Sequence, residues 1–416
     1  MMEDVMLYRK MKENGDELSI LGFGCMRLPQ KKGSPGSGKI DENRATKQIR
    51  MAIDMGVNYI DTGFQYHMGA CEPFLSRALS DGYREKIKLA TKLPHWMVKE
   101  KEDMDSILDS QLKRLGTEHL DYYLLHALNG QSWQKMEAFG VNDFLKNAKL
   151  DGRISNAGFS FHGDREAFTK IVDSNDWDFC QIQYNFLDEQ NQAGTEGLKY
   201  ASSKGLGVVI MEPLRGGLLA KKPPEEVGEI WAEAQETRTP PEWGLRWVWN
   251  HPEVSVVLSG MNDEAQIQEN VRVAGDSYPN SLSGEDVELI GRVADKYRSL
   301  MKAGCTGCRY CMPCPNGVDI PACFEAYNYS HMYGDKKWAK MQYFVFVSGL
   351  AGDPAMASQC EECGQCEEVC PQNLPIPELL KDVAFEMEDR FFNTKRWFFS
   401  QIMKLQRWKI RRSSNK

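Results

Sequence analysis

Eight of the twelve cysteines stand in two short rows near the end of the chain. Each row ends in a Cys-Pro pair, and the rows are Cys305, Cys308, Cys311 and Cys314, then Cys360, Cys363, Cys366 and Cys370. Thiolates three residues apart on a tight loop can converge on one inorganic core. The second row has the C-x2-C-x2-C-x3-C-P spacing of iron–sulfur proteins. The rows therefore predict two [4Fe–4S] clusters and one-electron chemistry.

The spacing also predicts how the two rows share the clusters. The last cysteine of such a row ligates the other cluster in two-cluster ferredoxins. The expected sets are therefore Cys305, Cys308 and Cys311 with Cys370, and Cys360, Cys363 and Cys366 with Cys314. The first row has two residues instead of three before its last cysteine, so Cys323 stands as an alternative ligand. A small buried thiol is the simpler interpretation of Cys323.

Other uses of cysteine explain the rows less well. Structural zinc usually takes two pairs of ligands, which two rows of four exceed. A disulfide framework suits small secreted domains, but this chain has 416 residues and begins MMEDVMLYRK, with no apolar leader. Reduced cysteines without an export signal predict a cytoplasmic protein.

Composition and charge limit the partners. With 42% hydrophobic and 26% charged residues, the chain resembles a soluble globular protein, and no apolar run is long enough to span a bilayer. The net charge of −8 argues against nucleic-acid binding. Residues 390–416 contain nine Lys or Arg and no acid, so the rest carries −8 − 9 = −17. Interleaved Trp and Phe make this tail a candidate for contact with an anionic membrane surface or an acidic partner, although a packed C-terminal helix explains the same pattern.

The first 280 residues alternate short apolar runs with stretches of helical period. The expected strands are 20–26, 57–61, 87–93, 121–127, 154–161, 179–186, 207–213 and 254–260. Expected helices between them include 42–55, 100–115, 165–173, 193–204 and 264–273. Runs buried on both faces and separated by helices imply a parallel sheet, and eight such units predict an α/β fold, a (β/α)8 barrel. A hairpin with its turn at Asn14-Gly15-Asp16 is expected to plug the lower end of the barrel.

The predicted domains are the barrel over residues 1–280, a helical linker and two-cluster domain over 281–390, and a basic aromatic tail over 391–416. The 45 residues between the two cysteine rows read as helix. That segment is too long for a compact β-type ferredoxin and favours an all-helical one. Gly33 to Lys39 fits a G-x4-G-K phosphate loop, but Ile40 replaces its Ser or Thr. A surface loop followed by Asp41 as a helix cap is the better interpretation.

Four polar side chains are expected on the active rim of this barrel, at the carboxyl ends of its strands. Asp61 ends the second run, Tyr66 follows in its loop, Lys92 closes the third run and His126 the fourth. Each alone has an ordinary explanation as a cap, a surface group or a packed core residue. Together, from three neighbouring strands, they point to one small volume.

These residues lie in motifs that resemble a known family. GFGCMRLP, YIDTGFQYHMGACE, ATKLP, DYYLLHA, GFS, QIQYN, EPLRGG and LSGMNDEAQIQEN are similar, in this order, to those of aldo-keto reductases over residues 1 to about 280. Residues from about 300 to 390 resemble a two-cluster helical ferredoxin, and the family includes a branch fused to such a module. The resemblance implies a catalytic tetrad of Asp61, Tyr66, Lys92 and His126.

The tetrad suits the reduction of a carbonyl to an alcohol. Tyrosine, with a reference pKa of about 10, is a poor acid at neutral pH. We expect the Lys92 ammonium to lower the pKa of Tyr66, the general acid, while Asp61 keeps Lys92 charged. His126 would orient the carbonyl oxygen. Related enzymes that reduce C=C bonds have glutamate in place of the histidine, so His126 favours carbonyl or alcohol substrates.

The resemblance implies a nicotinamide site only in part. The matching positions are Ser160 and Gln183 for the carboxamide, Gly216 and Gly217 for the pyrophosphate, Ser259, Gly260 and Gln266 after the last strand, and Glu269 and Asn270 for the adenine side. Phe161 replaces an expected asparagine, and Met211 replaces the aromatic residue that stacks on the nicotinamide. Gly260 and Gln266 replace the cations that grip the 2′-phosphate, so the choice between NADH and NADPH stays open.

Two functions follow from these patterns. The first is a cytoplasmic oxidoreductase that interconverts a small carbonyl or alcohol substrate and exchanges electrons through its clusters with ferredoxin or another redox protein. Because a hydride carries two electrons and a cluster one, a flavin or similar broker is expected, either in the modified pocket or in a partner. The alternative is an electron-transfer subunit in which the barrel is a docking scaffold. Trp96, Trp133 and Phe161 are candidate pocket residues that favour an apolar or ring-bearing substrate.

Overall fold

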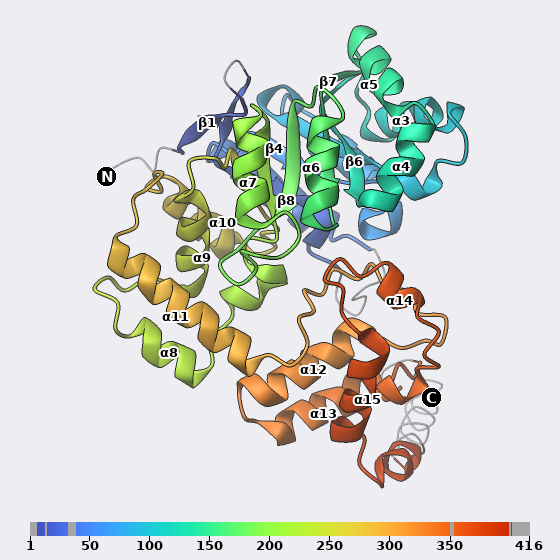
Figure 1. Cartoon of the computed structure of the whole chain (residues 1–416), viewed down its shortest axis with the longest axis vertical. Helices are drawn as coiled ribbons and strands as arrows, with labels where there is room; N and C mark the ends of the chain where they lie inside the picture. The colour runs from blue at the N-terminus through green and yellow to red at the C-terminus, as the bar shows by residue number, and fades with distance from the viewer. Residues whose placement is uncertain (1–5, 13–14, 32–38, 350–352, 399–400, 402–416) are drawn as a thin grey trace, which may run out of the picture. The chain divides into compact units, whose positions relative to one another are not determined.

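The computed structural model describes residues 6–12, 15–31, 39–349, 353–398 and 401 (Figure 1). The chain forms two compact units, and each is described by itself below. The first unit contains residues 1–221 and 236–290, and the second contains 222–235 and 291–416. The first unit thus reaches residue 290, where the sequence predicted a boundary at 280. Residues 222–235 group with the second unit, which the sequence did not indicate.

The first unit is built on a closed barrel of parallel strands (Figure 1). In order around the barrel these are β10 (Val256–Ser259), β3 (Leu21–Gly24), β4 (Tyr59–Asp61), β5 (Lys88–Leu93), β6 (Leu120–Leu128), β7 (Ile154–Phe161), β8 (Phe179–Gln183) and β9 (Gly207–Met211). Every run predicted as a strand contributes one of them, which confirms the (β/α)8 prediction. β4, β8 and β10 are buried at every position, as expected of strands covered on both faces.

Helices follow the strands of the barrel. They are α1 (Glu42–Asp54), α2 (Cys71–Ala78), α3 (Glu102–Leu115), α4 (Gly130–Ala138), α5 (Val141–Leu150), α6 (Arg165–Asp173), α7 (Gly194–Ser203), α9 (Pro240–Trp249) and α10 (Glu264–Ala274). Short 3-10 turns near the strand ends include η1 (Cys25–Arg27), η2 (Tyr66–Gly69), η4 (His95–Met97) and η5 (Arg215–Ala220). Asp41 caps α1 as predicted, because its carboxylate accepts a bond from Arg44 N at 3.3 Å. The loop from Gly33 to Gly38 lies outside the described residues.

A hairpin closes one end of the barrel. β1 (Tyr8–Lys10) pairs antiparallel with β2 (Glu17–Ser19). Met11 and Leu18 are buried in one cluster with residues that begin the barrel strands, including Tyr59. The hairpin therefore packs into the amino-terminal end of the barrel, as the sequence predicted, and leaves the opposite end for a site. Residues 13 and 14 of its turn lie outside the described range.

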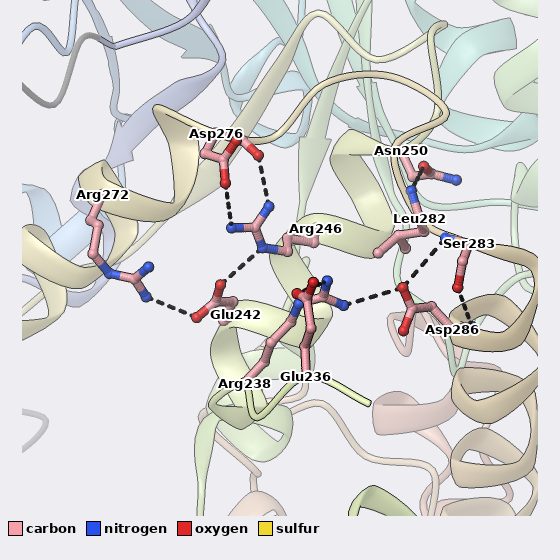
Figure 2. Close-up of polar contacts among 10 residues, drawn as sticks. All are labelled: Glu236, Arg238, Glu242, Arg246, Asn250, Arg272, Asp276, Leu282, Ser283 and Asp286. Carbon is pink, nitrogen blue, oxygen red and sulfur yellow. Dashed lines mark hydrogen bonds and ion pairs between the residues drawn. The ribbon is translucent and has the colours of Figure 1, made fainter. Parts of the chain in front are cut away.

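Ion pairs join α9 to the end of α10 (Figure 2). Glu242, in the first turn of α9, is buried and accepts from Arg246 at 2.9 Å and from Arg272 at 2.8 Å. Arg246 in turn donates to the Asp276 carbonyl at 2.7 Å. Burial raises the pKa of Glu242, but the bonds from Arg272 and Arg246 outweigh it and hold the pKa below its usual value. The network fixes the helices that carry the last part of the rim.

Helices joined by loops make up the described residues of the second unit, which contain no β-strand. It contains α8 (Glu225–Trp231), most of α11 (Gly284–Leu300), α12 (Ile320–Met332), α13 (Lys336–Val347), α14 (Gln365–Glu368) and α15 (Ile376–Met387). α12 packs against both α13 and α15 around a small apolar core (Figure 1). The helical ferredoxin-like architecture predicted for this region is thereby confirmed. No helix among the described residues has the length and apolar character needed to cross a membrane.

Candidate functional site

Lys92 is the centre of a buried polar group at the carboxyl ends of β4 and β5. Its side chain is 1% exposed, and its Nζ lies 2.7 Å from both carboxylate oxygens of Asp61. The same Nζ donates to the Thr62 carbonyl at 2.7 Å and lies 3.2 Å from the Tyr66 hydroxyl. An ammonium has three donors, and here they face a carboxylate, a carbonyl and a phenol. The structure thus brings together three of the four predicted residues.

The backbone after β4 is shaped to bring Tyr66 back over the strand ends. His67 and Met68, the next two residues of η2, have φ of 52° and 55°, in the left-handed region. A Cβ on Gly63 would lie 3.1 Å from the Tyr66 ring, which is tighter than ordinary contact. Glycine is therefore needed where the ring crosses the chain.

The protonation of Tyr66 differs from the expectation. Burial raises the pKa of the Tyr66 phenol well above its usual value, and the Asp61 carboxylate adds to the rise. The predicted lowering by Lys92 is outweighed, because the ammonium is paired with Asp61 at short range. Burial also raises the pKa of Asp61, against the opposing effect of Lys92. Tyr66 is held protonated, the state that a proton donor requires.

His126 is the fourth member of the group. It lies in β6 and is 2% exposed, and its ring centroid is 6.2 Å from that of Tyr66 in an edge-on arrangement. Burial lowers the pKa of His126 well below its usual value, and Lys92 lowers it further. The imidazole is therefore neutral, with one N–H donor and one acceptor nitrogen.

Of the three aromatic residues predicted to line the pocket, only Trp96 lies exposed beside the tetrad. It is in η4, 42% exposed, with its ring 5.2 Å from that of His126. Trp133 and Phe161 are almost fully buried, in ring contacts with Trp177 and Phe168. Packing accounts for these two, so the inference of a pocket lined by all three was wrong.

The residues predicted to grip the carboxamide take part in internal hydrogen bonds. Ser160 Oγ accepts from Ala127 N at 2.7 Å. Gln183 donates from Nε2 to Asp188 at 2.8 Å, and its Oε1 accepts from Gln192 at 2.7 Å. Because its N–H group donates and its oxygen accepts, these two bonds fix which way the Gln183 amide points.

Asp188 is the hub of a buried network that sequence reasoning missed. One of its oxygens accepts from Gln183, from Asn185 at 3.0 Å and from Arg215 at 2.9 Å. Arg215 and Asp188 are 5% and 8% exposed. The two residues lie in different loops, and Arg215 has an unusual φ of 47°. The only signal in the sequence was a charged residue inside the motif EPLRGG.

The other nicotinamide candidates lie in η5, at the end of β10, in the turn that follows β10 and in α10. Ser259 Oγ accepts from Asn270 at 3.1 Å, Glu269 accepts from Thr239 at 2.6 Å, and Gln266 accepts from Asn262 N at 3.1 Å. Gly216 and Gly217 have φ of 64° and 95°, which other residues adopt with strain.

A cation that the sequence did not predict lies at this turn. A Cβ on Gly260 would lie 3.4 Å from Arg27, an exposed residue of η1. Acids lie there too, because Arg44 pairs with Asp263 at 3.0 Å and Glu264 at 2.8 Å at the start of α10. Charges of both signs therefore surround the predicted 2′-phosphate position.

The cysteine rows line two cavities in the second unit. One, of about 320 Å³, is lined by Cys314, Cys360, Cys363 and Cys366, together with Cys311. The other, of about 20 Å³, is lined by Cys305, Cys308, Cys311 and Cys370. These sets match the crossed assignment drawn from the spacing. Backbone amides also point at sulfur: Gly307 N lies 3.4 Å from Cys305 Sγ, and Glu362 N lies 3.4 Å from Cys360 Sγ.

Cys323 lies elsewhere. It is fully buried in the apolar core, with its Sγ 3.7 Å from the Ala355 carbonyl, and lines neither cavity. Within the described ranges, no three His, Cys, Asp or Glu side chains are close enough to share a single metal ion. A four-iron core takes one thiolate at each iron, so the two sets of four cysteines suit two such clusters by the number and type of their ligands.

Comparisons with known proteins match both domains of the chain. Residues 20–289, well over half of the chain, match the aldo/keto reductase family, and residues 304–374 match a 4Fe-4S dicluster domain. The chain is 25% identical to the uncharacterized oxidoreductase YqkF of Bacillus subtilis, over 68% of this chain and 94% of that protein. It is 23% identical to the NADH-specific methylglyoxal reductase of Escherichia coli, over 67% of this chain and 95% of that protein.

A solved structure is similar as well. The aldo-keto reductase AKR11C1 from Bacillus halodurans, in its holo form, superposes with a TM-score of 0.57 at 25% identity, covering 69% of this chain and 96% of that chain. The closed barrel, the polar group at its rim and the cysteine rows therefore have a common explanation. The chain belongs to the aldo/keto reductase family and carries a C-terminal 4Fe-4S dicluster domain.

Proposed function

We propose that the protein interconverts a small carbonyl compound and its alcohol, with Tyr66 as the general acid and base. The observation that carries this proposal is the position of Lys92 Nζ, 2.7 Å from both Asp61 oxygens and 3.2 Å from the Tyr66 hydroxyl. A buried ammonium held beside a phenol has a clear chemical use. It stabilises the phenolate that remains when the phenol gives up its proton.

The protein groups divide the work of reduction between them. A bound nicotinamide supplies the hydride that is added to the carbonyl carbon. Tyr66 donates its proton to the carbonyl oxygen, so the C=O group becomes CH–OH and the phenol becomes phenolate. Lys92 stabilises that phenolate, and Asp61 keeps Lys92 charged. Neutral His126 donates a hydrogen bond to the same oxygen and orients it. In alcohol oxidation these roles run in reverse.

The nicotinamide site that we propose would use Gln183 and Ser160 for the carboxamide, with Met211 at the position of the aromatic residue that stacks on the ring in the family. The fixed direction of the Gln183 amide supports this, since bonds with Asp188 and Gln192 hold it in place. Gly216 and Gly217 supply a backbone that can close over the pyrophosphate, and Ser259, Gly260, Gln266, Glu269 and Asn270 border the adenine side. The name of the NADH-specific relative supports NADH as the first donor to test.

We further propose that the clusters link the barrel chemistry to a one-electron protein such as ferredoxin. Two [4Fe–4S] clusters supply single-electron transfer, and the two sets of four cysteines are the residues that would hold them. Because hydride transfer moves an electron pair, a flavin or another two-electron broker completes this scheme. FMN and FAD are therefore included with NADH and NADPH in the binding titrations that test it.

The decisive experiment is Tyr66→Phe in anaerobically purified, cluster-loaded protein, with methylglyoxal and a panel of aldehydes as substrates. Loss of the proton donor is expected to reduce turnover by about 10²–10⁴-fold, with iron and sulfide content unchanged. Tyr278→Phe, at an exposed position of the same unit, serves as the matched control and is expected to behave like the parent. Full turnover in Tyr66→Phe would refute the proposed role.

A second candidate is an electron-transfer subunit whose barrel is a docking scaffold. Met211 in the stacking position and the internal bonds of Ser160 and Gln183 favour it. This alternative predicts that cluster reduction by ferredoxin persists while no nicotinamide binds and no carbonyl is reduced. The same titrations and the Tyr66→Phe comparison distinguish the two.

A further inference from the structure

An apolar surface rimmed by cations lies on the second unit, apart from the chemistry proposed above. We call it the α13 face. Its exposed members are Trp338, Met341, Val345 and Phe346 of α13, and Phe391, Trp397 and Phe398 of the following C-terminal segment. Their exposed fractions run from 39% at Val345 to 67% at Phe346. Scattered apolar residues are common on surfaces, but a group of large side chains on adjoining elements usually marks an interaction site.

The spacing within α13 places exposed apolar residues away from the face that packs on the core, although Trp338 also packs against Tyr329, with ring centroids 4.3 Å apart. Trp338, Met341 and Val345 are three and four residues apart, so they share one face of the helix. Ala339 and Val347 lie on the opposite face and are buried in the core. A helix that only covers a core needs one apolar face, and α13 has two.

The two parts of the α13 face are joined by aromatic packing. Phe392 is 5% exposed, and its ring lies 5.3 Å from that of Phe344 and 5.9 Å from that of Tyr343. Phe392 therefore packs directly on α13. This contact makes α13 and the segment that carries Phe391, Trp397 and Phe398 adjoining parts of the second unit.

The charges around the α13 face are almost all positive. Residues 336–347 and 390–398 contain no Asp or Glu, and their cations are Lys336, Lys337, Lys340, Arg390, Lys395 and Arg396. The acids at its borders are Asp335, which caps α13, Asp389, which pairs with Lys395 at 2.6 Å, and Glu388, which accepts from Tyr343 on the core side of α13 at 2.6 Å. The sequence after residue 398 adds six more Lys or Arg and no acid, although residues 399–400 and 402–416 of the predicted basic aromatic tail lie outside the described range.

We propose that the α13 face binds the surface of a bilayer that contains anionic lipids. Trp, Phe and Met side chains can enter the boundary between head groups and acyl chains, while lysines contact lipid phosphates. A second copy of this chain fits poorly, because it would bring cations against cations. A one-electron protein carrier also fits poorly, because no residue of the face lines either cysteine cavity.

The test is sedimentation of the full-length, cluster-loaded protein with vesicles. Vesicles of equal parts phosphatidylcholine and phosphatidylglycerol are expected to bind at least about tenfold more tightly than phosphatidylcholine alone, with binding weakened by salt. Equal binding to both vesicles, or to neither, overturns the proposal. Light scattering on the same samples detects self-association, and a dimer broken by the variants below would identify a second copy as the occupant and overturn it as well.

Two variants separate the charged and apolar contributions. Lys336→Glu/Lys337→Glu/Lys340→Glu and Trp397→Ala/Phe398→Ala are each expected to weaken binding to the mixed vesicles by more than about tenfold. Matched controls on the barrel are Lys47→Glu/Lys113→Glu/Lys146→Glu and Leu150→Ala, which also change exposed residues. Loss of binding in the controls, or none in the α13 variants, contradicts the proposal. Iron content and circular dichroism confirm that each variant is folded and loaded.

Discussion

The barrel and the cysteine-rich unit hold their sites by different means. In the barrel, protein atoms alone fix Lys92, because three oxygen atoms lie 2.7 Å from its Nζ. In the second unit, the first cysteine row lies in the loop between α11 and α12. The second row lies between α13 and α15, where the short helix α14 contains Cys366. The cysteines of both rows line cavities instead of contacting a common partner. Hydrogen bonds between protein groups hold Lys92 in place. The cysteine side chains, in contrast, are expected to be held in place by the clusters that they bind.

This difference follows from what surrounds each site. The barrel strands that carry the tetrad pair with neighbours on both sides and are buried at all but one position in each of β5 and β6. The second unit has a small core, formed mainly by α12, α13 and α15. Small domains commonly depend on a metal or a disulfide for part of their stability, because their apolar cores are limited. We therefore expect the clusters to be structural as well as electronic.

The largest expected effect is that of iron removal. Anaerobic chelation is expected to abolish the ordered structure of residues 304–374 while the barrel keeps its own thermal transition, because no bond that fixes Lys92 involves a cysteine row. Hydrogen exchange by mass spectrometry reports on both regions in one sample. Equal protection of the cysteine segments before and after chelation would show that the second unit, like the barrel, is ordered without its clusters.

The next largest effect is expected at Lys92. Lys92→Met removes the ammonium that stabilises the phenolate and leaves Asp61 buried without its cation. Turnover should fall by about 10³-fold, and stability by about 3 kcal/mol. The double variant Lys92→Met/Asp61→Asn is the control: it should regain much of the stability and none of the turnover. Recovery of turnover in the double variant would show that Lys92 acts only through folding.

Much of the barrel could be predicted from sequence because its signals are local. The buried runs ISNAGFSF and DYYLLHA coincide with β7 and β6, and Asp61, Lys92 and His126 end strands whose order in space is fixed by the closed barrel. The crossed pairing of the cysteine rows stays a prediction from their spacing. Each cavity is lined by the four cysteines expected for one cluster, and the larger cavity also by Cys311.

What the sequence could not reveal depends on contacts between distant loops. Asp188 follows β8 and Arg215 follows β9, and the two residues come into contact because these strands are paired in the barrel. Neither residue lies in a local sequence pattern that predicts the contact. Arg27 reaches Gly260 because β3 and β10 are neighbours only after the barrel closes. The pKa of Tyr66 was expected to be lowered, since the presence of Lys92 can be read from the sequence while the degree of burial cannot.

A smaller effect is expected for Asp188, which accepts hydrogen bonds from Gln183, Asn185 and Arg215. Asp188→Asn keeps the shape but removes the charge that faces Arg215 and one acceptor for Gln183. Because the amide of Gln183 would lose its fixed direction, the Kd for NADH should rise about tenfold with little change in kcat. Asp176→Asn, at an exposed position nearby in sequence, should leave both unchanged. A fall in thermal stability with an unaltered Kd would instead assign Asp188 a structural role.

The smallest effect expected, a twofold change, separates the two candidate ligands in the second unit. Cys314 lines the larger cavity with the second cysteine row, whereas Cys323 is enclosed by the apolar core. Cys314→Ala should therefore lower iron and sulfide by about half, since one of two clusters loses a ligand while the other keeps all four. Cys323→Ala should cost about 1 kcal/mol of stability and leave the iron content unchanged. The opposite pattern, with iron lost only in Cys323→Ala, would reassign the ligand and show that residues 304–323 rearrange when the cluster binds.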